Sequence, residues 1–104
     1  MSDSLLYLTT TGRVSGLPRE IEIWFAESEG RLYLLAEHFH NAQWVRNIQS
    51  NASVRVRIAE REWAATARVL EPKRDREKWE LAQELFRQKY GWGDGLPVEF
   101  TIVG

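Results

Sequence analysis

A cluster of hydroxyl, glycine and guanidinium groups lies near the start of the sequence, in the segment LTTTGRVSGLPRE at residues 8–20. The backbone N–H groups of a glycine-containing turn, together with hydroxyls and guanidiniums, supply the donors that a phosphate needs. The candidate donors are Thr9, Thr10, Thr11, Gly12, Arg13, Ser15 and Arg19. The segment therefore indicates an anion site, although a plain β-hairpin with solvated arginines explains the same residues. It is no Walker or dinucleotide-fold loop, because the lysine or third glycine is missing.

Two histidines, His38 and His40, are two residues apart and would share a face if the chain there is extended. A zinc site needs further ligands, and the sequence contains no cysteine and no other histidine, which leaves only Glu37 or distant carboxylates. We therefore expect no metal site. We interpret the pair as polar loop residues, or as a pair of which one contacts a ligand near the start of the next helix.

Trp44 and Asn47 are three residues apart in a segment predicted to be helical, so their side chains face the same way. One could stack on a ligand while the other hydrogen-bonds to it, and packing of Trp44 in the core is the alternative. Tyr90 and Trp92 lie in the glycine-rich segment YGWGDG, where they could line a pocket or cover a neighbouring subunit. No spacing of serine, histidine and aspartate suggests a hydrolytic triad.

The composition limits the classes of function. The 104 residues are 43% hydrophobic and 28% charged, which predicts a single globular domain over residues 1–104. A net charge of -1 argues against a nucleic-acid-binding barrel. The absence of cysteine is compatible with the reducing cytoplasm, where we expect the protein, and no apolar run is long enough for an integral membrane segment.

Alternating apolar residues predict six short strands, and two segments have helical periodicity. The strands are expected at residues 5–8, 19–26, 31–36, 53–58, 63–70 and 98–103. A short helix is predicted between Asn41 as N-cap and Asn51, and a longer one between Pro72, near its first turn, and Gly91, just beyond its end. The order β-β-β-α-β-β-α-β favours a mainly β protein with two helices, built as a small antiparallel barrel.

With these residues in view, the sequence resembles the deazaflavin-dependent nitroreductase and quinone reductase group of the FMN-binding split β-barrel superfamily. This superfamily also includes proteins like pyridoxamine 5'-phosphate oxidase. The resemblance rests on four segments: LTTTGRVSGLPRE, RLYLLAEH, WVRNIQSNASVRVRI and KYGWGDGLPVEFTIV. It implies a six-stranded split β-barrel that binds coenzyme F420, a deazaflavin. The reduced cofactor would transfer hydride to a small electron-poor acceptor, such as a quinone or nitroaromatic.

The resemblance also implies a cofactor site. In relatives the first loop holds the phosphate, a role that carries over to the loop residues Thr10, Thr11, Gly12, Arg13, Ser15 and Arg19. The segment after the third strand and the short helix lie near the ring system in relatives, which carries over to His38, Trp44 and Asn47. No catalytic acid or base is implied, because the cofactor carries the chemistry while the protein orients it.

The sequence departs from the relatives at three places. Val14 stands where relatives often have lysine. After the third strand, many relatives have a small residue and a lysine together with glycines, whereas this chain has Glu37, His38, Phe39 and His40. Relatives often have an N-terminal helix that encloses the site, whereas here the first strand begins almost at once. This predicts a homodimer in which a second subunit completes the pocket. FMN is the alternative cofactor, and an FMN-binding protein or a binding module without turnover is the alternative function.

Overall fold

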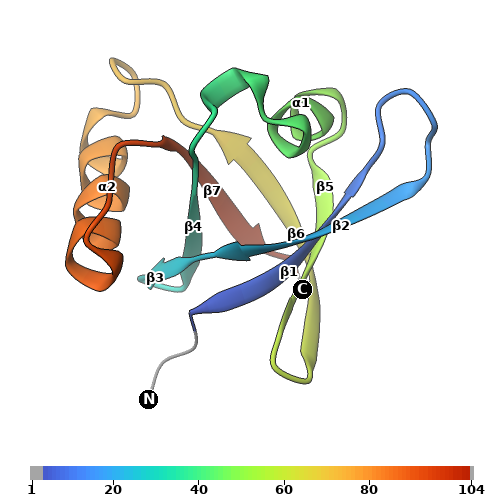
Figure 1. The fold of residues 1–104 in the computed structure, drawn as a ribbon, viewed down its shortest axis with the longest axis horizontal. Helices are drawn as coiled ribbons and strands as arrows, with labels where there is room; N and C mark the ends of the chain where they lie inside the picture. The colour runs from blue at the N-terminus through green and yellow to red at the C-terminus, as the bar shows by residue number, and fades with distance from the viewer. Residues whose placement is uncertain (1–3, 104) are drawn as a thin grey trace.

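The computed structural model describes residues 4–103, which form one antiparallel sheet of seven strands, two α-helices and a short 3-10 helix, η1 (Figure 1). The strands are β1 Leu5–Thr11, β2 Pro18–Trp24, β3 Ala26–Ser28, β4 Arg31–Ala36, β5 Ser53–Ile58, β6 Arg61–Val69 and β7 Leu96–Ile102. The helices are η1 Phe39–Asn41, α1 Gln43–Ser50 and α2 Arg76–Tyr90. The predicted fold class is confirmed. Within residues 4–103, neither α-helix is long and apolar enough to cross a bilayer.

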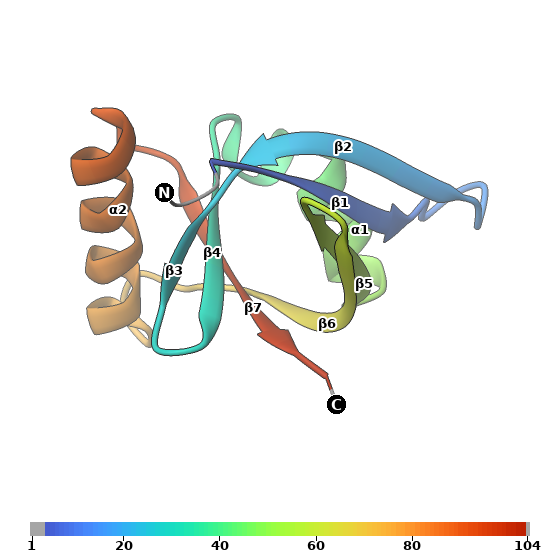
Figure 2. The ribbon, with the colours of Figure 1, turned by 90° about the horizontal axis from the view of Figure 1, so that it is seen from below.

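The sheet curls into a barrel that closes at Phe25. Its strand order is β2-β1-β5-β6-β7-β4-β3, so the two outermost strands are separated in the chain by Phe25 alone (Figure 2). The single strand predicted over residues 19–26 is therefore divided in two, which gives seven strands instead of six. The Phe25 N–H donates to the Ser4 carbonyl at 3.2 Å, and the Phe25 carbonyl accepts from Lys89 Nζ at 3.0 Å and from the Tyr90 hydroxyl.

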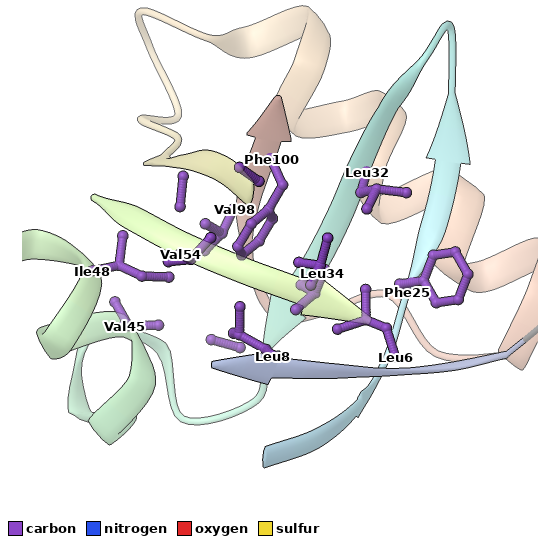
Figure 3. Close-up of a cluster of buried hydrophobic side chains, with 14 of the residues drawn as sticks. Leu6, Leu8, Phe25, Leu32, Leu34, Val45, Ile48, Val54, Val98 and Phe100 are labelled. Atoms are coloured by element: carbon purple, nitrogen blue, oxygen red, sulfur yellow. The ribbon is translucent and has the colours of Figure 1, made fainter. Parts of the chain in front are cut away.

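Alternating side chains of five strands fill the interior of the barrel. The inward-facing residues include Leu6, Leu8, Leu32, Leu34, Val54, Val56, Ala65, Ala67, Val98 and Phe100, all of which are buried. Val45 and Ile48 of α1 pack against them, so this helix covers one end of the barrel (Figure 3). Burial of each large aliphatic side chain contributes about 1.5 to 3 kcal/mol, and this end of the barrel therefore stabilises the position of α1.

Strand β4 is buried on both faces, as its continuous apolar sequence predicts. Leu32 and Leu34 face the interior, whereas Tyr33 and Leu35 face outward and pack with Phe86 of α2 in a second cluster. α2 therefore lies against the outer surface of the barrel, beside β4 (Figure 1). It ends at Gly91 as predicted.

Both helices begin later than the sequence predicts. The N-cap of α1 is Ala42, because Asn41 belongs to η1 and its N–H donates to the His38 carbonyl at 3.0 Å. The C-cap is Asn51, as expected.

α2 begins at Arg76 rather than near Pro72, since a turn comes first and the Glu71 N–H donates to the Asp75 carboxylate at 2.9 Å. The same carboxylate accepts two bonds from the Arg68 guanidinium, each of 2.9 Å. Although burial opposes it, the hydrogen bonds from Glu71 and Arg68 lower the pKa of Asp75 below its ordinary value.

A buried carboxylate, Glu99, joins α2 to the outer surface of the sheet. Its carboxylate accepts from the Tyr33 hydroxyl at 3.0 Å and, through Oε1, from Lys78 Nζ at 3.4 Å. The closest oxygens of the carboxylate lie 3.1 Å from Lys78 Nζ, 3.5 Å from Arg68 and 3.8 Å from Arg31. Burial alone would raise the pKa of Glu99, but the bonds from Lys78 and Tyr33 outweigh burial and lower it. Burial and the Glu99 carboxylate together raise the pKa of Tyr33 to about 12.

We predict that Glu99→Gln lowers the free energy of unfolding by about 2 kcal/mol, because three cations lose the buried carboxylate that they share. The loss is no larger because the cations stay partly exposed to water. The pKa of Glu99 is lower in the folded state than in the unfolded one, so its contribution is present above the unfolded value of about 4 and is lost as the pH falls through the folded value. Urea denaturation at several pH values between about 3 and 7 measures both the loss of stability in the variant and its dependence on pH.

The matched control is Glu80→Gln, because the Glu80 side chain is exposed and pairs only with exposed Arg76, at 3.3 Å. It should change stability by less than about 0.5 kcal/mol. Equal stability of the two variants at neutral pH would contradict a structural role for Glu99.

Candidate functional site

The loop that joins β1 to β2, residues 12–17, is tightly folded. The Gly12 N–H donates to the Leu17 carbonyl at 2.8 Å, and the Gly16 N–H donates to the Gly12 carbonyl at 2.8 Å. A Cβ atom on Gly12 would lie 2.7 Å from Ser15 Oγ, and Gly16 has a φ of +73°. The left-handed backbone at Gly16 favours glycine, and a larger residue at Gly12 would crowd the Ser15 side chain and the Leu17 carbonyl oxygen.

Asn47 of α1 fixes this loop to the barrel. Its side chain is buried, Nδ2 donates to Thr10 Oγ1 at 3.1 Å, and Oδ1 accepts from the Arg13 backbone N–H at 3.2 Å and from the Arg13 guanidinium at 2.9 Å. One amide thus joins strand β1, the loop and the helix. Its role is to position Arg13.

A second amide holds the same guanidinium. Gln43 Oε1 accepts from the other terminal nitrogen of Arg13 at 2.7 Å. Gln43 lies four residues before Asn47, on the same face of α1. Sequence reasoning missed Gln43, and this spacing of four residues from a predicted site residue is the signal that could have found it.

Two cations in this region have no acidic partner. Among the ion pairs formed by residues 4–103, none includes Arg13 or Arg19. The Arg19 guanidinium donates to the Ser15 hydroxyl at 3.4 Å. By contrast, Arg55 and Arg57 on the neighbouring β5 are paired with glutamates. The guanidiniums of the loop can therefore bind an external anion without first breaking an ion pair.

Most of the predicted cofactor residues line one cavity of about 640 Å³, here named the loop cavity. They are Thr10, Gly12, Arg13, Ser15, Arg19, Trp44 and Asn47. Val14, Pro18, Glu20, Ile21 and Gln43 complete the lining. The two exceptions are Thr11 and His38.

The position of Thr11 follows from the length of β1. The strand extends to Thr11 instead of ending at Leu8, so the threonines belong to a strand and alternate between its faces. Thr10 is buried beside Asn47, and Thr11 points to the other face. The prediction that Thr11 contributes to the same site is not supported by this geometry.

A second cavity of about 770 Å³, here named the aromatic cavity, adjoins the loop cavity. Its lining is mostly apolar and includes Trp24, Trp44, Phe86 and Trp92, with Leu5, Ile23, Leu35, Ala42, Glu22, Glu37, His38 and Gln43. Trp44 and Gln43 line both cavities. Trp24, Phe86 and Gln43 were not expected from the sequence, because strands and helices far apart in the chain bring them together.

Tyr90 supports the wall of the aromatic cavity from behind. Its ring stacks on Trp24, with centroids 4.5 Å apart and planes 9° from parallel, and its hydroxyl donates to the carbonyls of Ser4 and Phe25. Trp92 lines the cavity itself, which is one of the two positions expected for it; the other was contact with a neighbouring subunit. The stacked pair therefore fixes the orientation of Trp24.

The chain is not extended at the two histidines, because the 3-10 helix η1 begins at Phe39, so the condition under which they would share a face is not met. His38 lines the aromatic cavity. His40 Nδ1 lies 3.3 Å from Gln49 Nε2, and the residue lines a different cavity beside Trp79. Across the described part of the chain, no cluster of histidine, aspartate and glutamate is placed to hold a metal ion.

The two cavities together fit a phosphorylated planar ring. The loop cavity offers two guanidiniums and the hydroxyls of Thr10 and Ser15, a donor set that suits a phosphate. The carboxylate in its lining, Glu20, pairs with Arg57 at 3.7 Å. The aromatic cavity offers indole and phenyl surfaces against which a flat ring can pack.

Residues 1–98 match the family described as F420H(2)-dependent quinone reductase. The chain belongs to this family. It is accordingly an F420-dependent oxidoreductase, as the resemblance in sequence predicts. F420 is the cofactor that the family indicates, with a flavin as the alternative. No curated protein is similar enough to the chain to match it.

Solved structures share the fold. An F420-H2 dependent reductase is 23% identical, with a TM-score of 0.70, and the match covers 99% of this chain and 96% of that one. A protein solved as a domain-swapped dimer is 24% identical, with a TM-score of 0.70 and coverage of 99% and 82%. HutZ, a heme storage protein from Vibrio cholerae, is 19% identical, with a TM-score of 0.78 and coverage of 97% and 82%.

We predict that Asn47→Leu lowers the free energy of unfolding by about 1 to 3 kcal/mol, because Thr10 and Arg13 lose their buried partner. The loop should also exchange its amide hydrogens faster, especially at Gly12 and Gly16, since it is no longer joined to α1. Urea denaturation and hydrogen exchange measure the two effects. Gln49→Leu, at an exposed position of the same helix, is the control; loop protection equal to that of the control would contradict the role of Asn47.

Proposed function

We propose that the chain binds phosphorylated F420 across the two cavities and that the reduced cofactor passes hydride to a quinone or nitroaromatic. The phosphate lies in the loop cavity, and the ring lies in the aromatic cavity. One observation carries this proposal: Trp44 and Gln43 line both cavities, so a single elongated ligand can occupy both.

Each part of the site has a distinct task. Arg13 and Arg19 bind the phosphate, and Asn47 and Gln43 hold the Arg13 guanidinium in place. Trp44 packs against the ring where the two cavities meet. When bound, the reduced deazaflavin supplies the hydride; the protein supplies orientation, electrostatics and exclusion of water.

The acceptor occupies the rest of the aromatic cavity. Trp24, Phe86 and Trp92 present aromatic surfaces there, and a flat electron-poor ring packs well between such groups. A volume of about 770 Å³ lies within the ordinary range for small-molecule sites. A quinone or a nitroaromatic meets these requirements.

FMN is the second candidate cofactor, because it also carries a phosphate and the donors of the loop cavity recognise the phosphate rather than the ring. Val14 is 93% exposed and carries no charge, so the loop lacks the third cation that relatives often have. The two guanidiniums therefore suit the phosphate of either cofactor. Titration with F420 and with FMN, followed by reduction and addition of menadione, separates three outcomes: F420-dependent turnover, FMN-dependent turnover, and binding without turnover.

We predict that Arg19→Ala weakens F420 binding by about 2 kcal/mol, or about 30-fold in Kd, because one charge-assisted bond to the phosphate is lost. The deazaflavin riboside that lacks the phosphate should bind the variant and the parent protein with Kd values within about twofold, because it cannot make this bond. Quenching of tryptophan fluorescence measures all four affinities.

Arg55→Ala is the matched control, because Arg55 lies outside both cavities and pairs with Glu62 at 2.6 Å. It should leave both affinities unchanged. An equal loss of affinity for F420 and for the riboside in Arg19→Ala would place Arg19 away from the phosphate and contradict the proposed orientation of the cofactor.

We also propose that two copies associate through the tip of the β1–β2 hairpin. Val14 and Leu17, 93% and 59% exposed, present aliphatic surface there, and the hairpin extends beyond the body of the barrel (Figure 1). The similar protein solved as a domain-swapped dimer supports association of this fold. The cytoplasmic location stays a prediction.

The double variant Val14→Asp, Leu17→Asp should be monomeric, because it places a charge at each aliphatic position of the contact. Light scattering after size-exclusion chromatography measures the mass in solution. Leu81→Asp, on the outer face of α2, should retain the mass of the parent protein. A dimeric double variant would contradict association through the hairpin.

A further inference from the structure

The aromatic cavity contains one side chain that can donate a proton at neutral pH. Its titratable lining residues are Glu22, Glu37 and His38. Carboxylic acids have ordinarily lost their protons at pH 7, whereas an imidazole carries and exchanges one in this range. The remaining lining residues are apolar, aromatic or, at Gln43, a neutral amide.

The proposed reaction needs such a proton. Hydride transfer brings two electrons and one hydrogen to a quinone, and the reduced product, a hydroquinone, contains a second hydrogen that must arrive as a proton. Building on the proposed function, we infer that His38 is the general acid that delivers this proton to the quinone oxygen.

A C–H bond of the reduced deazaflavin would break as its hydride forms an O–H bond at one quinone oxygen. The N–H bond of the His38 imidazolium would break as its proton goes to the other oxygen, which has become negative. The quinone is reduced, the deazaflavin is oxidised and also releases a proton to solvent, and neutral His38 takes up a proton from water. No further oxidant or reductant is required.

The geometry of His38 suits this cycle. The residue is exposed to solvent as well as lining the cavity, so it can be recharged from water between turnovers. Among residues 4–103 its ring forms no hydrogen bond or ion pair that would hold the proton. The residue lies next to Phe39, whose φ of +52° turns the chain between β4 and α1.

The other elements around the cavity bring no competing donor. β2 contributes the carboxylate of Glu22, and Glu37 lies between β4 and His38. α1 contributes only Gln43, Trp44 and the preceding Ala42, while α2 and the segment after it contribute Phe86 and Trp92. Protonated His38 would therefore be the single cation in the lining of the aromatic cavity. Its positive charge would also stabilise the quinone oxygen that becomes negative.

The chain provides a matched control, since His40 is its only other histidine and lines a different cavity. We expect His38→Ala to lower kcat for menadione with reduced F420 by about 100-fold and His40→Ala to leave it within about twofold. Added imidazole should restore activity to His38→Ala, because free imidazole can enter the exposed position and donate the proton. It should not change the rate of His40→Ala.

A readout independent of turnover uses the NMR signals of the two imidazoles, which the His40→Ala variant assigns. Titration of the parent protein with oxidised F420 and menadione should move the His38 signals and leave those of His40 in place. The pH profile supplies a further test: the fall in kcat with rising pH in the parent protein should be absent in His38→Ala, where solvent supplies the proton.

The outcomes distinguish this inference from the proposed function. If the parent protein reduces menadione but His38→Ala matches His40→Ala, or gains nothing from imidazole, the role of His38 is overturned and the reductase function stands. If the parent protein binds reduced F420 and reduces neither quinones nor nitroaromatics, the proposed function and the role of His38 fail together. Unmoved His38 signals in the presence of menadione would also overturn the inference.

Discussion

Closure of the barrel at Phe25 is the constraint on which the rest of the structure depends. One run of chain provides both outer strands of the sheet, so β2 pairs with β1 and β3 pairs with β4 on either side of a single residue. The N–H and carbonyl groups of Phe25, which are not paired with a neighbouring strand, form hydrogen bonds with Ser4, Lys89 and Tyr90 instead. Because two of these partners belong to the end of α2, the same closure fixes the helix beside the barrel and Tyr90 behind Trp24.

The candidate site depends on a second connection, made by Asn47. A loop of six residues with two glycines would sample many conformations, and each ordered residue costs about 1 to 2 kcal/mol of backbone entropy. Bonds from one buried amide to Thr10 and to Arg13 hold the base of the loop in one arrangement before any ligand arrives. A phosphate would therefore meet a guanidinium that is already ordered, which lowers the cost of binding.

Local patterns predicted most of the elements, and tertiary contacts explain the differences. Period-two alternation identified the strands because a half-buried strand requires it. The division at Phe25 is invisible in that pattern, since apolar residues continue to alternate through it, and only barrel closure makes the break necessary. The three threonines were interpreted as loop residues, yet β-branched side chains favour strands, and pairing with β2 extends β1 to Thr11.

The residues of the candidate site were named from the sequence, but the contacts between them were not. The resemblance identified Arg13, Trp44 and Asn47, and the structure brings them to one cavity. Contact between Arg13 and Asn47, 34 residues apart, requires α1 to pack on β1, and no local signal contains that information. His38 and His40 lie at different cavities because the backbone of Phe39 between them is left-handed. A phenylalanine rarely adopts this conformation, so the sequence does not predict the turn.

The distribution of charge connects the fold to the site. With 14 basic and 15 acidic residues, the chain has no overall field that would attract an anion. Many of the ion pairs nevertheless lie away from the loop cavity. The single carboxylate of Glu99 lies within 4 Å of three cations, and Arg55 and Arg57 of β5 pair with glutamates. Within residues 4–103, Arg13 and Arg19 form no ion pair, so these two guanidiniums owe their availability to placement rather than to composition. A nearly neutral protein can in this way recognise a phosphate while remaining unattractive to long polyanions, whose binding depends on many cations spread along a surface.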